Sequence, residues 1–188
     1  MASSWNPAAP LQYFRNSGYG SFENQSSDAG FDGLYGGLNI LQADYDNDGD
    51  KDLLVANMGS NRRPLDEEIA TALYKNLLME TGEPNFENVT RQAGLMRDTI
   101  EEDAIVGGIT GTGSGIAWAD YNNDGYLDIF VRTSDDDIDN SLFKNNGDGT
   151  FTEVTKEAGV GILGKVLKAD SQGNGAWLDV NLDGLVDL

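Results

Sequence analysis

Three nine-residue segments of this chain are rich in side chains that could bind a cation. DYDNDGDKD spans 44–52, DYNNDGYLD spans 120–128 and DVNLDGLVD spans 179–187, and they are called loop 1, loop 2 and loop 3. Each has an oxygen-bearing side chain at its first, third, fifth and ninth positions and a glycine at its sixth. Carboxylates this close together repel one another unless a cation lies among them, which indicates ion-binding turns.

Ca²⁺ is the cation that this spacing fits best. Oxygen donors two residues apart, with a glycine that permits a sharp turn, suit Ca²⁺, whereas Mg²⁺ demands tighter octahedral geometry and retains its waters. The chain has no histidine and no cysteine, which disfavours transition metals. The sequence therefore predicts three Ca²⁺ sites, in which the seventh residue contributes its backbone carbonyl and leaves its side chain free. The expected ligand residues are Asp44, Asp46, Asp48, Asp50 and Asp52; Asp120, Asn122, Asp124, Tyr126 and Asp128; and Asp179, Asn181, Asp183, Leu185 and Asp187.

Two other interpretations of the loops are weaker. Asp, Asn and Gly favour plain turns, but three copies in register favour binding. An EF-hand needs a bidentate Glu at position 12 and helices on both sides, and position 12 is Val55 in loop 1 and Val131 in loop 2. GIAWAD before loop 2 and YLDIFV after it are β-branched and aromatic with partial alternation, so the loop is expected to join two strands.

A second element recurs between the loops, beginning near Gln12, Leu73 and Leu142. Each copy has an aromatic residue, a basic residue and an Asn, then a turn, a Phe and an Ala-Gly pair. The matching residues Phe22, Phe86 and Phe151 are spaced by 64 and 65. LFKN-NGDG-TFTEVT predicts a tight-turn β-hairpin. A loop hairpin and a tight-turn hairpin in succession make a four-stranded antiparallel sheet, and repetition of such sheets builds a β-propeller.

WADYNNDGYLDIFV followed by LFKNNGDGTFTEVTKEAGV resembles the VCBS/FG-GAP-like repeat of calcium-binding β-propellers. That group is related to the integrin α-subunit propeller and to secreted ASPIC/UnbV-type proteins. The resemblance covers roughly residues 11–188. It implies one propeller blade per repeat, with Ca²⁺ in the loop between the first two strands of a blade.

The repeats predict an N-terminal tail at 1–10 and an all-β propeller region at 11–188, with about three blade-equivalents. Its units are 11–57, 72–133 and 141–188, with inserts at 58–71 and 97–113, either of which could be a binding surface or a decorated loop. LDEEIATAL in the first insert has helix formers and predicts a short helix. The first recognisable element is a tight-turn hairpin and the last is a loop hairpin. The expectation is a piece of a larger propeller, or one completed by other chains through strand pairing.

The composition narrows the function classes. The formal net charge is −20 and the pI is near 4.1, which makes nucleic acid an improbable partner. Without cysteine there are no disulfides. No stretch approaches the ~18 apolar residues that span a membrane, so no membrane insertion is expected. The N-terminal residues lack the basic and apolar regions of a signal peptide, although a signal could have been removed.

A non-enzymatic extracellular module for adhesion, scaffolding or self-assembly is the favoured function. Its expected partner is a protein or glycan on the cell surface or matrix, or another copy of itself. A carbohydrate-binding propeller and the non-catalytic part of a larger secreted enzyme are the alternatives. Trp5, Trp118 and Trp177 would be the first candidates for sugar stacking, but Trp118 and Trp177 share one repeat position, which favours a core role.

Overall fold

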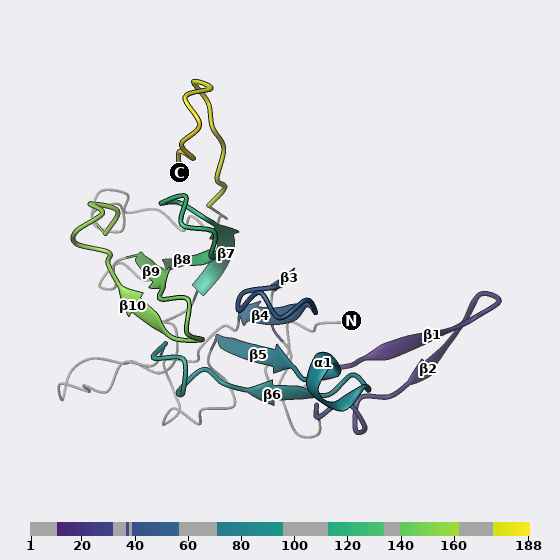
Figure 1. Ribbon diagram of the computed structural model, residues 1–188. Coiled ribbons are helices and arrows are strands. Elements are labelled where there is room, and N and C mark those ends of the chain that lie inside the picture. Colours follow the sequence, from purple (N-terminus) through teal and green to yellow (C-terminus); the bar gives the residue numbers. More distant parts are fainter. Residues whose placement is uncertain are drawn as a thin grey trace.

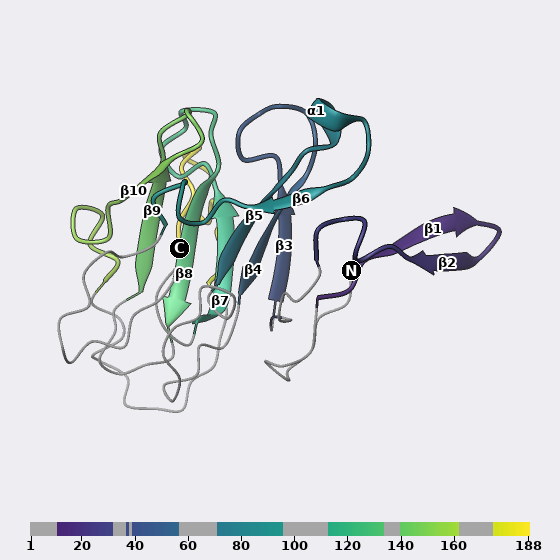
Figure 2. The same ribbon diagram turned by 90° about the horizontal axis from the view of Figure 1, so that it is seen from below.

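The computed structural model describes residues 11–31, 37, 39–56, 71–95, 113–133, 140–161 and 175–188. In these residues the chain is all-β apart from one four-residue helix. The strands form two four-stranded antiparallel sheets and one two-stranded sheet (Figures 1 and 2). The expected four-stranded antiparallel sheets are therefore present.

The first four-stranded sheet follows chain order. It contains β3 (Asn39–Ala43), β4 (Asp52–Ala56), β5 (Ala72–Asn76) and β6 (Phe86–Asn88). Loop 1 joins β3 to β4, and helix α1 (Leu78–Thr81) lies between β5 and β6. The sequence interpretation placed only a turn there. The short run of helix formers ends at Gly82, whose left-handed conformation caps the helix.

The second four-stranded sheet repeats this arrangement with different connections. It contains β7 (Gly113–Ala119), β8 (Asp128–Thr133), β9 (Ser141–Asn145) and β10 (Phe151–Glu153), again paired in chain order. Loop 2 joins β7 to β8, and a tight turn joins β9 to β10. Each sheet thus combines a loop hairpin with the hairpin that follows it, so the sheet boundaries fall inside the units 11–57 and 72–133.

Two hairpins remain outside these sheets. β1 (Phe14–Gly18) and β2 (Ser21–Asn24) pair only with each other in the described part of the chain. Loop 3 lies in segment 175–188, where Leu178 and Asp187 form one antiparallel bridge with reciprocal 2.9 Å N–H···O=C bonds. The two hairpins project from different ends of the molecule (Figure 1).

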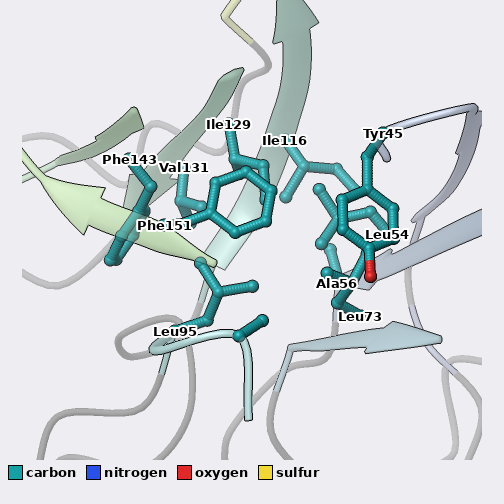
Figure 3. Packing of buried hydrophobic residues seen from close by; sticks show 11 residues of the cluster. Tyr45, Leu54, Ala56, Leu73, Leu95, Ile116, Ile129, Val131, Phe143 and Phe151 are labelled. Carbon is teal, nitrogen blue, oxygen red and sulfur yellow. The ribbon is translucent and has the colours of Figure 1, made fainter. Parts of the chain in front are cut away.

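The core lies on both faces of the first sheet. Leu54 and Ala56 of β4 share a cluster with Ile129 and Val131 of the second sheet (Figure 3). Leu53 and Val55 share a different cluster with residues near the N-terminal hairpin, including Leu11 and Phe31. Successive strand residues point to opposite faces, so the unbroken apolar run DLLVA is explained by a sheet covered on both sides.

Short Ala-Gly turns form backbone hydrogen bonds with the next hairpin of the same kind along the chain. The carbonyl of Ala29 accepts the N–H of Phe86 at 3.0 Å, and the carbonyl of Ala93 accepts the N–H of Phe151 at 2.8 Å. A Cβ on Gly30 would lie 2.6 Å from the Phe86 carbonyl oxygen, and φ at Gly30 is +83°. Glycine is therefore required at this turn, because the backbone is left-handed and the next unit lies in contact with it.

Several sequence-based expectations fall outside the described residues. They include the tail, residues 65–70 of the helix predicted in LDEEIATAL, and nearly all of both inserts. The helix prediction is wrong at the end of that segment, where Ala72 and Leu73 begin strand β5. Trp5 also lies there. Among the described residues, no helix is long and apolar enough to cross a membrane.

Candidate metal centre

The three acidic loops share one backbone conformation. The residue at position 4 is left-handed in each, with φ of 60° at Asn47, 58° at Asn123 and 62° at Leu182. The position-6 glycines also have positive φ, at 103°, 89° and 87°. A left-handed backbone brings the Cβ of most residues into steric conflict, whereas glycine has no Cβ and adopts it freely. This explains why Gly recurs at position 6. This shared conformation brings the side chains at positions 1, 3 and 5 toward one another.

Loops 2 and 3 are closed by the same internal hydrogen bonds. In loop 2, Asp120 accepts the N–H of Asp124 at 2.9 Å and that of Gly125 at 2.8 Å. The Nδ2 of Asn122 donates to Asp124 Oδ2 at 2.9 Å. Loop 3 repeats these contacts among Asp179, Asn181, Asp183 and Gly184. An amide at position 3 thus partly satisfies the carboxylate at position 5.

Loop 1 has carboxylates where the other loops have an amide. Asp46 cannot donate a hydrogen bond when ionised, so it cannot close the loop as Asn122 does. Asp44 Oδ1, Asp46 Oδ1 and Asp50 Oδ1 are buried and find no hydrogen-bond partner among the described residues. Carboxylate oxygens of Asp44, Asp46 and Asp48 lie within 4.8 Å of one another. Buried, unpaired carboxylate oxygens are costly, so this donor set fits a hard divalent cation such as Ca²⁺.

The Asp50 side chain departs from the sequence-based expectation. The sequence assigned position 7 only a backbone carbonyl, with its side chain free. The structure instead buries the Asp50 carboxylate, leaving 4% exposed, and Oδ2 accepts the N–H of Met79 at 3.0 Å. Burial raises its pKa. Its carboxylate lies near those of Asp48 and Glu80, so α1 brings another acidic residue to loop 1.

Lys75 is a built-in counter-charge for loop 1. Its Nζ lies 2.5 Å from Asp46 Oδ2, 3.1 Å from Asp48 Oδ2 and 3.0 Å from Glu80 Oε1. Burial opposes the charge on this lysine, but the hydrogen bonds with Asp46, Glu80 and Asp48 outweigh it and raise its pKa. The equivalent residue in the second sheet, Lys144, makes a looser 3.4 Å pair with Asp124 Oδ2.

If loop 1 binds Ca²⁺, Lys75→Met is expected to tighten that binding roughly tenfold, because the lysine would compete with the ion for Asp46 and Asp48. The ion-free protein should lose about 1–3 kcal/mol of stability. Calorimetric titration and melting in chelator measure the two effects. Lys144→Met is the matched control and should change both much less. Equal or weaker calcium binding by Lys75→Met would contradict the competition.

The ninth-position aspartates anchor the loops to the sheets. Asp52 accepts the N–H of Tyr45 at 3.2 Å and that of Asn76 at 2.9 Å. Asp128 accepts the N–H of Tyr121 at 3.1 Å and that of Asn145 at 2.7 Å. In loop 3, Asp187 accepts the N–H of Val180 at 3.1 Å. Each carboxylate oxygen retains a second lone pair, so these bonds leave position 9 able to ligate a cation.

The ninth-position carboxylates of the two complete sheets are deeply buried. Burial raises the pKa of Asp52 to about 7 and that of Asp128 to about 6, against the lowering effect of their backbone hydrogen bonds. The sequence placed these residues among the ligands but did not indicate that they also hold the following hairpin. Asn76 and Asn145, which it did not single out as site residues, are their partners.

The loops also contact one another in chain order. Asn47 Nδ2 donates to the carbonyl of Gly125 at 3.2 Å, and Asn123 Nδ2 donates to the carbonyl of Gly184 at 3.3 Å. The position-4 side chain of one loop therefore reaches position 6 of the next. Loop 3 has Leu182 at position 4, which is exposed and cannot donate such a bond. Loops 1 and 2 lie at the same end of their sheets (Figure 2).

The two described tryptophans are both partly buried. Trp118 is partly buried against the core between the sheets. Trp177 stacks on Tyr121 with ring centroids 6.4 Å apart and meets Phe130 edge-on at 6.2 Å. Trp118 therefore packs against the core as its repeated position predicted, whereas Trp177 makes aromatic contacts outside the core clusters of the described residues.

These features define a class of protein: an all-β repeat protein in which each four-stranded sheet joins an acidic loop hairpin to a second hairpin that follows it in the chain. Residues 120–188 match the family model of the FG-GAP-like repeat. The resemblance inferred from the motifs is therefore confirmed over that segment, which contains loops 2 and 3. A search of curated proteins found no significant match.

Proposed function

We propose that this protein is a non-enzymatic, calcium-binding module of β-propeller type that acts outside the cell in adhesion, scaffolding or assembly. The observation that carries the proposal is loop 1, where three buried carboxylate oxygens have no hydrogen-bond partner among the described residues. Loops 2 and 3 share its backbone conformation, which supports a site in each. Asp44, Asp46 and Asp48 would hold the ion in loop 1, which when bound would neutralise the clustered carboxylates and hold the turn.

The propeller assignment has support from topology and from the family match. Four-stranded antiparallel sheets in chain order are the blades of a propeller. Core residues of the two sheets pack into one cluster, as neighbouring blades do. The extracellular assignment has support from the chemistry of the loops. Clustered carboxylates need a cation to neutralise them, calcium is plentiful outside cells, and extracellular modules bind Ca²⁺ with dissociation constants of about 10⁻⁴–10⁻³ M.

The non-enzymatic assignment has support from composition. Without histidine and cysteine, the chain lacks the residues of Ser-His and Cys-His nucleophile systems. We propose a protein or glycan at the cell surface or matrix as its partner, or another copy of the chain. Capture of the calcium-loaded protein by a glycan array would favour the carbohydrate-binding alternative.

Calorimetric titration with Ca²⁺ tests the metal assignment. Three sites are expected, with loop 1 the tightest because it carries the most carboxylates. Asp46→Asn gives loop 1 the amide of loop 2 and should weaken that site about tenfold, whereas Asn122→Asp should strengthen loop 2. Absence of any calcium binding by the folded protein would overturn the proposal, and Mg²⁺ binding of equal strength would remove its selectivity argument.

A further inference from the structure

A second group of carboxylates lies where loop 1 meets helix α1. Carboxylate oxygens of Asp48, Asp50 and Glu80 lie within 4.8 Å of one another, and these three residues are called the junction group. Ca²⁺ binds oxygen at about 2.3–2.6 Å, so two oxygens on opposite sides of one ion are separated by about 5 Å. The spacing of the junction group therefore allows one ion to contact all three side chains.

Asp50 distinguishes the junction group from an ordinary acidic patch on the surface. The residue is 4% exposed, and its Oδ2 accepts the N–H of Met79 at 3.0 Å. Its Oδ1 is buried and has no hydrogen-bond partner among the described residues. The neighbouring carboxylates of Asp48 and Glu80 offer it repulsion and no donor when they are ionised. A buried oxygen in this position is costly unless a cation satisfies it.

The junction group is distinct from the donor set within loop 1. That set consists of Asp44, Asp46 and Asp48, whose oxygens also lie within 4.8 Å of one another. Asp50 is not part of it, and among the described residues only Asp48 belongs to both groups. Each oxygen of a carboxylate has two lone pairs, so one carboxylate can serve two ions. The residues thus form two adjacent centres that share Asp48.

The local charge at loop 1 is larger than one Ca²⁺ can neutralise. Loop 1 has five aspartates, Glu80 adds a sixth negative charge and Lys75 contributes one positive charge. With every acid ionised the total is −5, and one Ca²⁺ reduces it to −3. Loop 2 has three aspartates and its partner Lys144, which total −2, and one Ca²⁺ cancels that charge. Loop 1 therefore retains a charge that attracts a further cation.

Loop 2 uses the same position for a different contact. Its position-7 residue is Tyr126, whose ring carbon Cζ lies 2.8 Å from where a Cβ on Gly147 would be. Gly147 belongs to the tight turn between β9 and β10, which stands where the first sheet has α1. Position 7 of loop 2 therefore packs its ring on a turn. Position 7 of loop 1 instead brings a carboxylate to the carboxylate of Glu80.

Lys75 lies at the boundary between the two centres. Its Nζ is 3.1 Å from Asp48 Oδ2 and 3.0 Å from Glu80 Oε1, while Asp50 Oδ1 remains without a partner. An ion at the junction group would compete with this lysine for Asp48 and Glu80. The Glu80 side chain is 45% exposed, so it has room to turn from the lysine to the ion, and water can complete the coordination.

We propose that the junction group binds a second Ca²⁺ beside the ion of loop 1, with Asp48 bridging the two. Asp50 and Glu80 are then ligands of the second ion only. The inference rests on the calcium binding proposed for loop 1, because the two centres share Asp48. The second ion fastens loop 1 to α1, and thereby to the β5–β6 hairpin. Its dissociation constant should be near the weak end for extracellular modules, about 10⁻³ M, because Glu80 is partly exposed and Lys75 competes.

Equilibrium dialysis of the full chain against Ca²⁺, up to several times the dissociation constant of about 10⁻³ M, counts the bound ions. The wild type should bind one ion in each loop and a fourth at the junction group. Glu80→Ala and Asp50→Asn should each weaken the fourth site at least tenfold and leave three ions. An amide oxygen at position 50 can still accept the Met79 N–H, so Asp50→Asn keeps the fold. Glu83→Ala is the matched control, since it removes the same charge just beyond α1, and it should retain four ions.

The difference in ion number between the wild type and Glu80→Ala decides the proposal. Equal numbers would overturn the second centre, whether both proteins bind three ions or both bind four, and would leave the loop sites in place. Loss of an ion from Glu83→Ala as well would also overturn it, because the ion would then follow the net charge of the surface and not the junction group. Absence of any bound calcium in the wild type would overturn the loop sites together with the second centre.

Discussion

Removing calcium is expected to lower the melting temperature by roughly 15–30 °C if all three loops bind the ion. Each site contributes ~2.7 kcal/mol when free calcium is a hundredfold above its dissociation constant. For a chain of this size, 1 kcal/mol corresponds to about 2–4 °C. The physical cause is the return of uncompensated repulsion among the eleven carboxylates of the three loops.

Differential scanning calorimetry with calcium and with excess chelator measures the change. A fall of only about 5–10 °C would indicate one effective site, for which loop 1 is the candidate because of its unpaired carboxylate oxygens. Asp46→Asn should then remove most of that difference. A reducing agent should have no effect, because the chain has no cysteine. Identical melting curves with calcium and with chelator would rule out a structural role for the ion.

Asp128→Ala is expected to destabilise the ion-free protein by about 2–5 kcal/mol. Asp128 is buried and accepts the N–H groups of Tyr121 and Asn145, and the substitution leaves both donors without it. An unsatisfied buried donor costs ~1–3 kcal/mol. Denaturant unfolding in chelator isolates this effect from any contribution to metal binding.

Asp187→Ala is the matched control, since Asp187 occupies the same loop position but is exposed. It should cost well under 1 kcal/mol. Equal losses for the two variants would show that position 9 does not act through the following hairpin.

The wild type and Asp128→Ala should also differ in how their stability depends on pH. Burial raises the pKa of Asp128 to about 6 in the folded state, so the folded protein binds its proton more tightly than the unfolded chain does. Its contribution to stability is then greatest below the unfolded pKa of about 4 and declines as pH rises to about 6. The cost of Asp128→Ala should therefore be larger at pH 4 than at pH 8.

The sequence was most informative where the physical constraints are local. Oxygen donors two residues apart around a glycine define a turn whatever its surroundings, and all three loops adopt one conformation. β-branched and aromatic runs on either side of loop 2 form the strands β7 and β8 as expected. Pairing of each of loop hairpins 1 and 2 with the hairpin that follows it was also expected from the order of the repeats, and both four-stranded sheets show it.

Contacts between distant residues were not readable from the sequence. Asp50 and Glu80 approach each other only because α1 lies beside loop 1, and nothing in either segment alone indicates this. The Lys75 contacts and the Asn47 bond to Gly125 likewise depend on how hairpins and loops lie together in space. The second role of Asp52 and Asp128, holding the next hairpin, appears only when the strands are paired.

By itself, then, the sequence determined the turns, the hairpins and the donor chemistry, since these depend on residues within about ten positions of one another. Tertiary structure decided which carboxylates are buried without a partner among the described residues and which backbone N–H groups of the following hairpin bond to Asp52 and Asp128. Burial and partner choice depend on the whole packed assembly of sheets. A linear spacing of residues does not specify which oxygen atoms lose access to water.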